Sequence, residues 1–389
     1  MPPSFSLPDC ELPAPDPDAR AHGERVTAHL AEAIEAAGGA IPFRQFMELS
    51  LYAPGLGYYS AGSRKLGAEG DFVTAPEISP LFSRTLARAV APWLSALPED
   101  AGLLEVGAGS GRMAADLLAE LARQGMAPGY AILERSAELR ARQQATLAEQ
   151  ADRVCWLEDL PADFTGVVLA NELLDALPAH RVIWQDGEHR EAWVAREGEA
   201  FAWRSGPLSD PRLAPRMAAI AAAGLPEPYV SEINLTAEDW IATLGARLRR
   251  GAVLLFDYGY GRREYYHPER REGTLACHYR HRRHADPFRF PGLQDITCHV
   301  DFTAIADAAL AAGFRVAGYT TQAHFLLGSG LPELAGVVDD PREQLATANG
   351  IRRLTLPQEM GETVKVMLLT KALDAPRPGF ALRDLRHLL

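Results

Sequence analysis

The sequence predicts an α/β fold with a doubly wound, largely parallel sheet. Between residues 101 and 260, short apolar runs alternate with amphipathic helical stretches, which is typical of parallel strands buried on both faces. A second indication is a glycine-rich turn, residues 107–111, that follows the first apolar run. A third is the polar residues that follow several of the runs, because open α/β sheets bind ligands at the carboxyl ends of their strands.

The bulk properties describe an ordinary globular chain. Its 389 residues are 47% hydrophobic and 23% charged, enough for one large core or for one core and an accessory lobe. The net charge of −12 argues against nucleic acid as a partner. No apolar run approaches the ~20 residues that span a bilayer, so we expect no membrane partner.

The cysteines and the N-terminal residues indicate a reducing, cytoplasmic setting. The four cysteines form no C-x-x-C pair, so we expect neither a disulfide framework nor a metal site. The proline-rich, acidic start lacks the pattern of a secretion or transit signal. We therefore expect a cytoplasmic protein.

The expected organisation has three parts. They are a loose tail over residues 1–20, a helical region over 21–100, and the sheet domain over 101–389 with inserts at about 181–230 and 260–300. Residues 181–203 alternate apolar and polar side chains around Asp186-Gly187, which predicts an antiparallel hairpin or meander. Residues 260–300 show no clear period, and we expect a lid or binding insert there.

The most informative motif is Leu103-Leu-Glu-Val-Gly-Ala-Gly-Ser-Gly111. Its glycines, Gly107, Gly109 and Gly111, allow a sharp turn and a close approach of a ligand to the backbone. The dinucleotide fingerprint requires its third glycine where this chain has Arg112. With Glu105 before the turn, the spacing favours S-adenosylmethionine over a dinucleotide.

Polar residues follow the next strands along the chain. Glu134 ends the second strand, where an acid accepts hydrogen bonds from a ribose diol. Glu158 and Asp159 end the third strand, where we expect the adenine amino group, and Asn171 ends the fourth. The alternative is that such acids only cap helices or turns; for Glu134 we favour the ribose contact.

Several longer motifs identify a family. In chain order they are Gly70-Asp-Phe-Val-Thr-Ala-Pro-Glu-Ile-Ser79, Leu104-Glu-Val-Gly-Ala-Gly-Ser-Gly111, Asn171-Glu-Leu-Leu-Asp-Ala-Leu-Pro178, Asp257-Tyr-Gly259 and Asp295-Ile-Thr-Cys-His-Val-Asp-Phe302. With these motifs the chain resembles the MidA-type methyltransferases, which include the mitochondrial complex I assembly factor that methylates an arginine. The first and last motifs are absent from general methyltransferases and are the most specific.

The resemblance implies a fold, a cofactor and a partner. It implies the seven-strand class I methyltransferase sheet, S-adenosyl-L-methionine as cofactor and a protein substrate with an arginine acceptor. It also implies that the segment Asp71 to Glu77 closes over the cofactor, with Phe72, Thr74 and Pro76 at the cofactor site. The acidic N-terminus lacks the family's mitochondrial targeting peptide, so the substrate need not be a respiratory-complex subunit.

Glu172 and Asp175 are the leading candidates for catalysis at an arginine. A guanidinium stays charged in water, so carboxylates are needed to orient it, localise its charge and accept a proton. Both residues lie in the loop after the fourth strand, three positions apart. Adenine and glutamine methyltransferases have a proline pair after the asparagine, whereas Asn171 is followed by Glu172 and Leu173. A turn or cap role for Asp175 stays open.

His299 and Asp301 are further catalytic candidates. They alternate along an extended segment and so can share one face. His299 is either a proton acceptor or a structural histidine bonded to Asp301. They belong to a second tier of candidates together with Glu232, Asp257 and Tyr258.

Two other features invite functional interpretations. The run Cys277 to His284 lacks the paired ligands of a structural zinc site, and we favour a basic lid there. Trp184, Trp193 and Trp203 fall in the predicted hairpin, where core packing is preferred and a partner-docking face is the alternative.

The leading hypothesis is therefore a protein-arginine methyltransferase. One alternative moves the methyl group to a small molecule or another side chain. Another is an assembly chaperone that binds the cofactor without turnover. The oligomeric state stays open, with a homodimer among the options.

Overall fold

The computed structural model describes residues 12–61, 73–336 and 340–389, which fall into two compact units. The accessory unit contains residues 12–61, Ala176–Thr236 and Arg263–His299. The central-sheet unit contains Val73–Asp175, Ala237–Arg262 and Val300–Leu389. Each unit thus combines segments that are far apart in the sequence.

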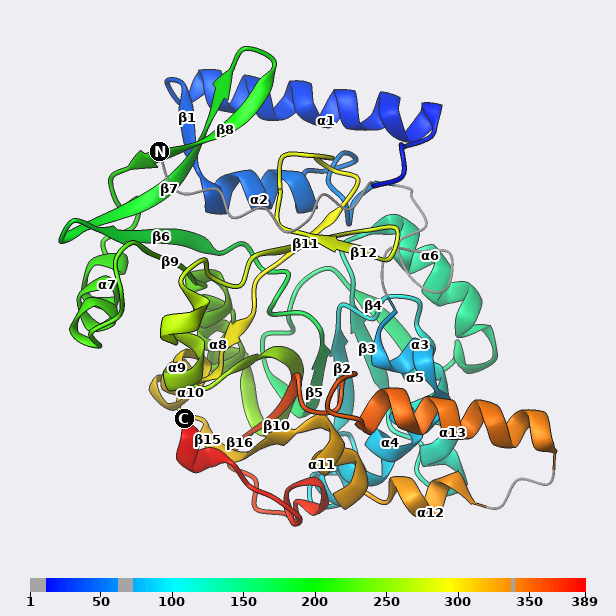
Figure 1. Cartoon of the computed structure of the whole chain (residues 1–389). Coiled ribbons are helices and arrows are strands. Elements are labelled where there is room, and N and C mark those ends of the chain that lie inside the picture. Colours follow the sequence, from blue (N-terminus) through cyan, green and yellow to red (C-terminus); the bar gives the residue numbers. More distant parts are fainter. Residues whose placement is uncertain (1–11, 62–72, 337–339) are drawn as a thin grey trace. The chain divides into compact units, whose positions relative to one another are not determined.

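The central-sheet unit alternates strands and helices (Figure 1). Its elements are α3 (Ala75–Ile78), α4 (Pro80–Ser95), β2 (Gly102–Val106), α5 (Arg112–Arg123), β3 (Tyr130–Leu133), α6 (Ala137–Thr146), η1 (Ala148–Gln150), β4 (Val154–Leu157), β5 (Phe164–Asn171), α8 (Leu235–Arg247), β10 (Leu248–Tyr260), β14 (Val300–Asp301), α10 (Phe302–Ala311), β15 (Arg315–Thr321), α11 (Gln322–Gly328), α12 (Leu331–Ala335), α13 (Pro341–Thr355), β16 (Val364–Lys371), η3 (Pro378–Phe380) and η4 (Arg386–Leu388).

The sheet of this unit confirms the predicted fold class. Its strand order is β15-β16-β10-β5-β2-β3-β4, with β14 paired to β10. The strands from β10 to β4 are parallel to their neighbours, and β16 is antiparallel to both β10 and β15. The seven strands from β15 to β4 match the expected seven-strand class I methyltransferase sheet, and β14 adds a short eighth strand beside β10.

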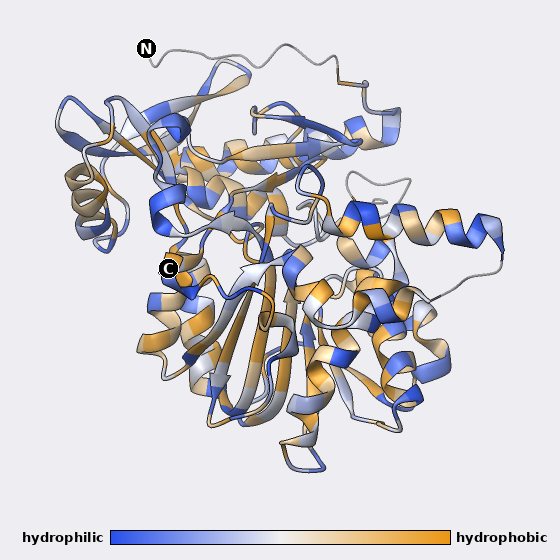
Figure 2. Ribbon diagram, turned by 60° about the horizontal axis from the view of Figure 1, so that its bottom comes forward, coloured by the Kyte–Doolittle hydropathy of each residue, from blue (hydrophilic) through white to orange (hydrophobic). Residues whose placement is uncertain are grey.

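The core of this unit follows from the apolar runs in its strands. Figure 2 shows the strands of the sheet largely in the orange of apolar residues, whereas the surrounding helices carry both orange and blue. Phe82 of α4 packs on Phe256 of β10 with ring centroids 5.1 Å apart. Ser79 caps α4, because its hydroxyl accepts a hydrogen bond from the Leu81 N–H at 3.3 Å.

The accessory unit contains two small sheets and several helices. Its elements are α1 (Pro17–Ala36), β1 (Ala40–Pro42), α2 (Phe43–Tyr52), β6 (His180–Gln185), β7 (Glu188–Glu197), β8 (Ala200–Gly206), α7 (Leu213–Ala222), β9 (Tyr229–Ile233), α9 (Arg262–Tyr265), η2 (Pro268–Arg270), β11 (Ala276–Tyr279), β12 (Arg282–His284) and β13 (Asp295–Thr297). Antiparallel pairing joins β1, β6, β7, β8 and β9 in one sheet and β11, β12 and β13 in the other.

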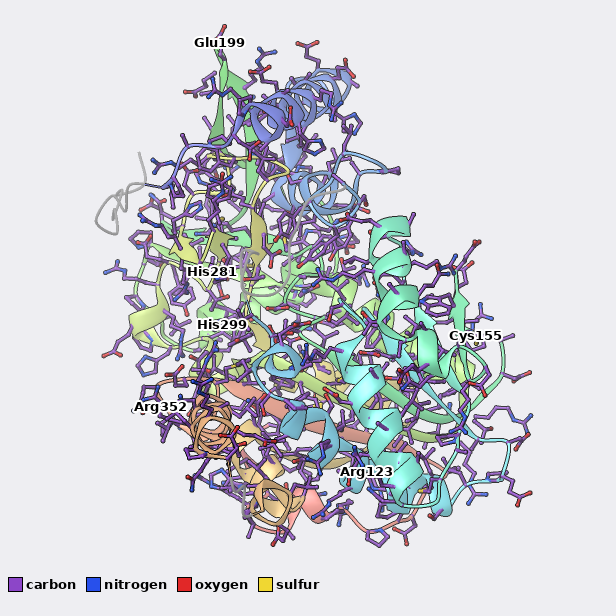
Figure 3. All side chains as sticks on the ribbon, turned by 90° about the vertical axis from the view of Figure 1, so that its right-hand side faces the viewer. Arg123, Cys155, Glu199, His281, His299 and Arg352 are labelled. Atoms are coloured by element: carbon purple, nitrogen blue, oxygen red, sulfur yellow. The ribbon has the colours of Figure 1, made fainter. Side chains whose placement is uncertain are left out.

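The predicted hairpin is present in the accessory unit. Asp186 and Gly187 form the turn between β6 and β7 with φ values of 53° and 72°, the left-handed conformation of a tight hairpin turn. Chain reversal at Glu199 forms a second hairpin, β7–β8, and Figure 3 shows Glu199 at its tip. Trp203 of β8 packs against Phe43 and Phe288 with centroid distances of 5.1 and 4.8 Å, but it is 38% exposed, so the choice between core packing and a docking face stays open.

The structure adds detail to one expectation about organisation and differs from two others. Helix α1 begins at Pro17 rather than after residue 20, because Asp16 caps it through the Ala19 N–H at 2.9 Å and proline suits the first turn. Residues 260–300 contain short helices and a small sheet, whose Arg- and His-rich strands carry no clear apolar alternation. The division expected at residue 100 also differs, because α4 belongs to the central-sheet unit.

Among residues 12–61, 73–336 and 340–389, no helix is both long enough and apolar enough to cross a membrane.

Candidate active site at the carboxyl edge of the central sheet

The carboxyl ends of the parallel strands meet at one edge of the central sheet. Val106 of β2 is in register with Leu133 of β3 and with Ala170 of β5. The Gly107 N–H continues the ladder by donating to the Leu133 carbonyl at 3.1 Å. The turns after these strands are therefore neighbours, as the sequence predicted for a ligand site at this edge.

The glycine turn after β2 has the conformation that its sequence requires. Gly107, Gly109 and Gly111 have φ values of 73°, 53° and 82°, a region that residues with a Cβ rarely adopt. A Cβ at Gly111 would lie 3.2 Å from the Gln143 Cα, and one at Gly107 would lie 3.4 Å from Leu173 Cδ1. The turn is thus a backbone cradle bordered by α6 on one side and by the loop after β5 on the other.

The motif around Pro76 contacts this turn. Thr74 occupies the N-cap position of the short helix α3 without a side-chain capping bond, and Pro76 is buried in the first turn of that helix. The Ser110 hydroxyl donates a hydrogen bond to Glu77 Oε1, which ties α3 directly to the glycine turn. Phe72 was also expected at the cofactor, but it lies outside the described residues.

Hydrogen bonds to both carboxylate oxygens help to hold Glu134 at the end of β3. Its Oε1 accepts the Ser136 N–H at 2.9 Å, and its Oε2 accepts from Gln143 Nε2 at 3.0 Å. Gln143, on α6, also donates to the Gly109 carbonyl at 3.1 Å. A fixed carboxylate beside the glycine turn is the arrangement expected for a ribose-binding acid.

Glu105 is buried within the sheet rather than exposed at the edge where a ligand would bind. It is 2% exposed, and its Oε2 accepts a hydrogen bond from the Tyr130 hydroxyl at 2.7 Å. Burial raises the pKa of Glu105 to about 7, against the opposing effect of the Tyr130 hydrogen bond. The contacts place Glu105 beneath the glycine turn, in a supporting position.

Glu158 and Asp159 follow β4 and are exposed. Asp159 lies 4.0 Å from an Arg135 nitrogen in an ion pair whose side chains are both largely exposed. Neither acid is held by buried contacts, so their predicted role at the adenine stays a prediction. Cys155, in the same edge strand, is labelled in Figure 3.

The loop after β5 carries an unusual backbone conformation. Glu172 has a φ of 51° although it is not a glycine, and such strain is concentrated at functional sites. Its N–H donates to the Phe256 carbonyl at 2.8 Å, and its Oε1 accepts from Asn171 Nδ2 at 3.2 Å. The Oδ1 of Asn171 is buried and has no hydrogen-bond partner among the described residues, which marks an acceptor available to a ligand.

Asp257, at the end of β10, holds this loop in place. Its Oδ2 accepts the N–H groups of Leu174 and Asp175 at 2.7 and 3.3 Å, and its Oδ1 accepts the Tyr258 N–H at 2.9 Å. Burial raises the pKa of Asp257 to about 7, although these backbone hydrogen bonds oppose the shift. Asp257, from the second tier of sequence candidates, is therefore a support of the loop.

Tyr258 belongs to the same acidic environment. Burial raises the pKa of its phenol far above the usual value, and the charges of Glu172, Asp175 and Asp257 raise it further. The phenol therefore stays protonated at neutral pH. The sheet edge thus gathers three carboxyl groups and one phenol, a set that suits a cationic ligand.

The other two catalytic candidates have structural contacts. Asp301 caps α10, because its Oδ1 accepts the N–H groups of Thr303 and Ala304 at 3.0 and 3.1 Å, and it lies 3.7 Å from Arg262 Nε. The His299 N–H donates to the Thr274 hydroxyl at 3.0 Å within the accessory unit. These contacts give Asp301 a capping role, and the role of His299 as a proton acceptor stays a prediction.

Two more sequence features have structural roles in the accessory unit. Glu232 is 1% exposed and accepts hydrogen bonds from Arg181 and from the N–H and hydroxyl of Thr274. The run from Cys277 to His284 forms the β11–β12 hairpin, with Arg280 and His281 in its turn. Within the described part of the chain, no group of three or more His, Cys, Asp and Glu residues could hold a metal.

Sequence reasoning missed the roles of Gln143, Glu77 and Ser110. The signal for Gln143 was its position four residues after Leu139 and four before Leu147, on the buried face of α6. A polar residue on such a face needs buried partners. Glu77 and Ser110 lie inside recognised motifs, but nothing local in the sequence pairs them.

Comparisons with known proteins bear on the family and on the cofactor. The family model Methyltransf_28, described as an S-adenosyl-L-methionine-dependent methyltransferase, matches residues 85–320. A crystal structure from Burkholderia thailandensis, bound to S-adenosyl-homocysteine, shares 45% sequence identity and a TM-score of 0.93, and the match covers 97% of this chain and 100% of that chain.

Curated relatives extend the comparison to a named activity. A mitochondrial protein arginine methyltransferase, the NDUFAF7 homolog of Drosophila melanogaster, is 28% identical, with 93% of this chain and 89% of its own covered. The protein arginine methyltransferase NDUFAF7 of Mus musculus is 30% identical, with coverages of 83% and 79%. The chain therefore belongs to the S-adenosyl-L-methionine-dependent methyltransferase family that the sequence motifs indicated.

Proposed function

We propose that this methyltransferase acts on an arginine side chain of a partner protein. The observation that carries the proposal is the loop after β5, where Glu172 is held at a φ of 51° three residues before the buried Asp175. This loop borders the glycine turn, since Leu173 lies next to Gly107. A neutral acceptor would not need carboxylates at this position.

The residues at the sheet edge suit the cofactor. S-adenosylmethionine, when bound, supplies an electrophilic methyl group on its sulfonium. Gly107, Gly109 and Gly111 provide a backbone surface without Cβ atoms, and Glu134 provides fixed acceptors for a ribose diol. Asn171 Oδ1 adds a buried acceptor without a partner among the described residues. These groups would hold the cofactor.

The carboxylates of the loop would act on the acceptor. A guanidinium spreads its positive charge over three nitrogens and is therefore a poor nucleophile. Glu172 and Asp175 would bind its N–H groups, localise the charge away from the attacking nitrogen and take up the released proton. Because Tyr258 stays protonated, it would donate a hydrogen bond rather than act as the base.

The curated relatives support the same acceptor, since their printed names describe protein arginine methyltransferases. This support is stronger because the alignments extend over most of this chain and most of each relative. A protein partner follows from this proposal, and the identity of that partner is what the experiment must find.

The test is methylation of proteins in a lysate. The purified chain is incubated with lysate and S-adenosylmethionine that carries an isotopically labelled methyl group, and labelled peptides are identified by mass spectrometry. We expect label on arginine. A peptide of the recovered sequence should be methylated, and the same peptide with lysine in place of that arginine should not.

Gly109→Val is the negative control, a variant that should not bind the cofactor. Valine disfavours the φ of 53° that this position requires. The variant should remain folded and give no labelled protein. Label on a small molecule or on another side chain would overturn the arginine assignment. Binding of S-adenosyl-homocysteine without any labelled product would favour a chaperone without turnover.

A further inference from the structure

Gln143 is a buried amide at the centre of the proposed cofactor site. It lies on α6 and is fully buried. Its Nε2 donates to the Gly109 carbonyl at 3.1 Å and to Glu134 Oε2 at 3.0 Å. Its Oε1 accepts from Trp156 Nε1 at 3.0 Å. One side chain therefore links the glycine turn, the acid after β3 and the edge strand β4.

These contacts use both amide hydrogens and the amide oxygen. The amide can therefore take only one orientation, because a flipped amide would place its oxygen against the Gly109 carbonyl and the Glu134 carboxylate. Loss of any one of these hydrogen bonds would cost free energy, since an unpaired polar group is unfavourable away from water. Gln143 thus fixes its three partners relative to one another.

We propose that Gln143 is a positioning residue that orients Glu134 toward the ribose of the cofactor and sets the preference for a ribose diol. The inference rests on the proposed cofactor site and adds a determinant to it. Glu134 receives one hydrogen bond from the backbone at Ser136 and one from Gln143. Without the bond from Gln143, the carboxylate loses one of the contacts that fix the direction that a diol requires.

Trp156 extends the same argument to the adenine side of the site. Its indole N–H fixes the oxygen end of the Gln143 amide. Replacement of the indole removes one of three bonds and leaves both donor bonds to Gly109 and Glu134 intact. We therefore expect Trp156 to contribute to the same preference, but less strongly than Gln143.

The test measures binding rather than turnover. Gln143→Met keeps the length of the side chain and removes all three hydrogen bonds. Gln144→Met is the matched control, because Gln144 is the next residue on α6 and is exposed. Calorimetry compares S-adenosyl-homocysteine with its analogue that lacks the ribose 2′-hydroxyl, for the full chain and each variant.

We expect the wild type and Gln144→Met to prefer the ribose form by about 10-fold or more. In Gln143→Met the affinity for S-adenosyl-homocysteine should fall by about 10-fold, and the preference for the ribose form should fall to about 2- to 3-fold. A merely structural role would lower the melting temperature and leave this preference unchanged, and that result would overturn the inference.

Trp156→Phe keeps the inference falsifiable if Gln143→Met fails to fold. We expect it to lower the preference for the ribose form by about 2-fold, and an unchanged preference in folded Trp156→Phe would overturn the inference. If the wild type itself did not bind S-adenosyl-homocysteine, the proposed function would fail together with the inference. A wild type that binds and a Gln143→Met variant with the same preference would overturn the inference alone.

Discussion

The backbone N–H of Leu174 donates a hydrogen bond to Asp257 Oδ2 over 2.7 Å. This bond joins the loop after β5 to the end of β10, two segments 83 residues apart in the sequence. It lies two residues beyond Glu172, whose φ of 51° is unfavourable for a side chain with a Cβ. Asp257 therefore helps to maintain the strained conformation that presents Glu172 at the sheet edge.

Asp257→Asn should lower turnover by about 10- to 100-fold, while S-adenosyl-homocysteine affinity changes only a few-fold. Both carboxylate oxygens of Asp257 accept backbone N–H groups, so an amide would turn its NH₂ toward one of them. Loss of hydrogen bonds to a charged group costs about 1.5–3 kcal/mol. Single-turnover methylation and calorimetry measure the two quantities.

The exposed Asp100 provides the matched control. Asp100→Asn should leave turnover and affinity as in the wild type. If Asp257→Asn had wild-type turnover, the loop would hold its conformation without Asp257, and the supporting role would be lost.

Glu77→Ala should weaken binding of S-adenosyl-homocysteine by about 5- to 10-fold, because the Ser110 hydroxyl in the glycine turn then loses its acceptor on α3. Calorimetry at fixed salt measures the effect. The control is Glu99→Ala, since Glu99 is exposed. Equal affinities in both variants would show that α3 does not organise the glycine turn.

The parts of the site that lie within one motif could be predicted from the sequence. Gly107, Gly109 and Gly111 follow a short apolar run, and their positive φ values were expected because the spacing itself requires a tight turn. The parallel strands could also be predicted from the sequence, since buried strands have short continuous apolar runs. The residues within each short segment are enough to predict both the glycine turn and the buried strands.

The supports of the site could not be predicted in the same way. Asp257 was only a second-tier candidate, because its partners Leu174 and Asp175 come from another strand loop. The cap that Asp301 forms on α10 could not be distinguished from a catalytic role, because a cap and a catalytic acid look alike in a sequence. Tertiary hydrogen bonds decide these roles, and a sequence does not show them.

Glu105→Gln should flatten the pH dependence of stability. Burial raises the pKa of Glu105 in the folded chain to about 7, above the ordinary value of 4.5. The folded state therefore binds this proton more tightly, and the stabilisation is present at low pH and lost as pH rises through about 7. Between these values the wild type should lose on the order of 1 kcal/mol per pH unit from this group.

Chemical denaturation at pH 5 and pH 8 measures this difference. The amide oxygen introduced by Glu105→Gln could still accept the Tyr130 hydrogen bond, so the variant should fold and lose less stability between the two pH values than the wild type. Parallel losses in the two proteins would show that Glu105 does not take up a proton in this range.

Glu172→Gln should keep cofactor binding and the fold but lose most of the turnover. Glutamine has the same shape and the same backbone preferences, so the strain at a φ of 51° is unchanged. Its amide oxygen can still accept the hydrogen bond that Asn171 Nδ2 gives to Glu172 Oε1 at 3.2 Å. The substitution therefore removes the negative charge and little else.

The charge matters because an arginine acceptor carries a positive charge that must be localised as the new bond forms. Loss of one charge-assisted contact in a site shielded from water typically lowers a rate by about two to three powers of ten. A neutral small-molecule acceptor would show a milder effect. Glu149→Gln, at an exposed glutamate, is the matched control. The measurement is single-turnover methylation at saturating cofactor, and equal rates for Glu172→Gln and the wild type would remove the main chemical support for an arginine acceptor.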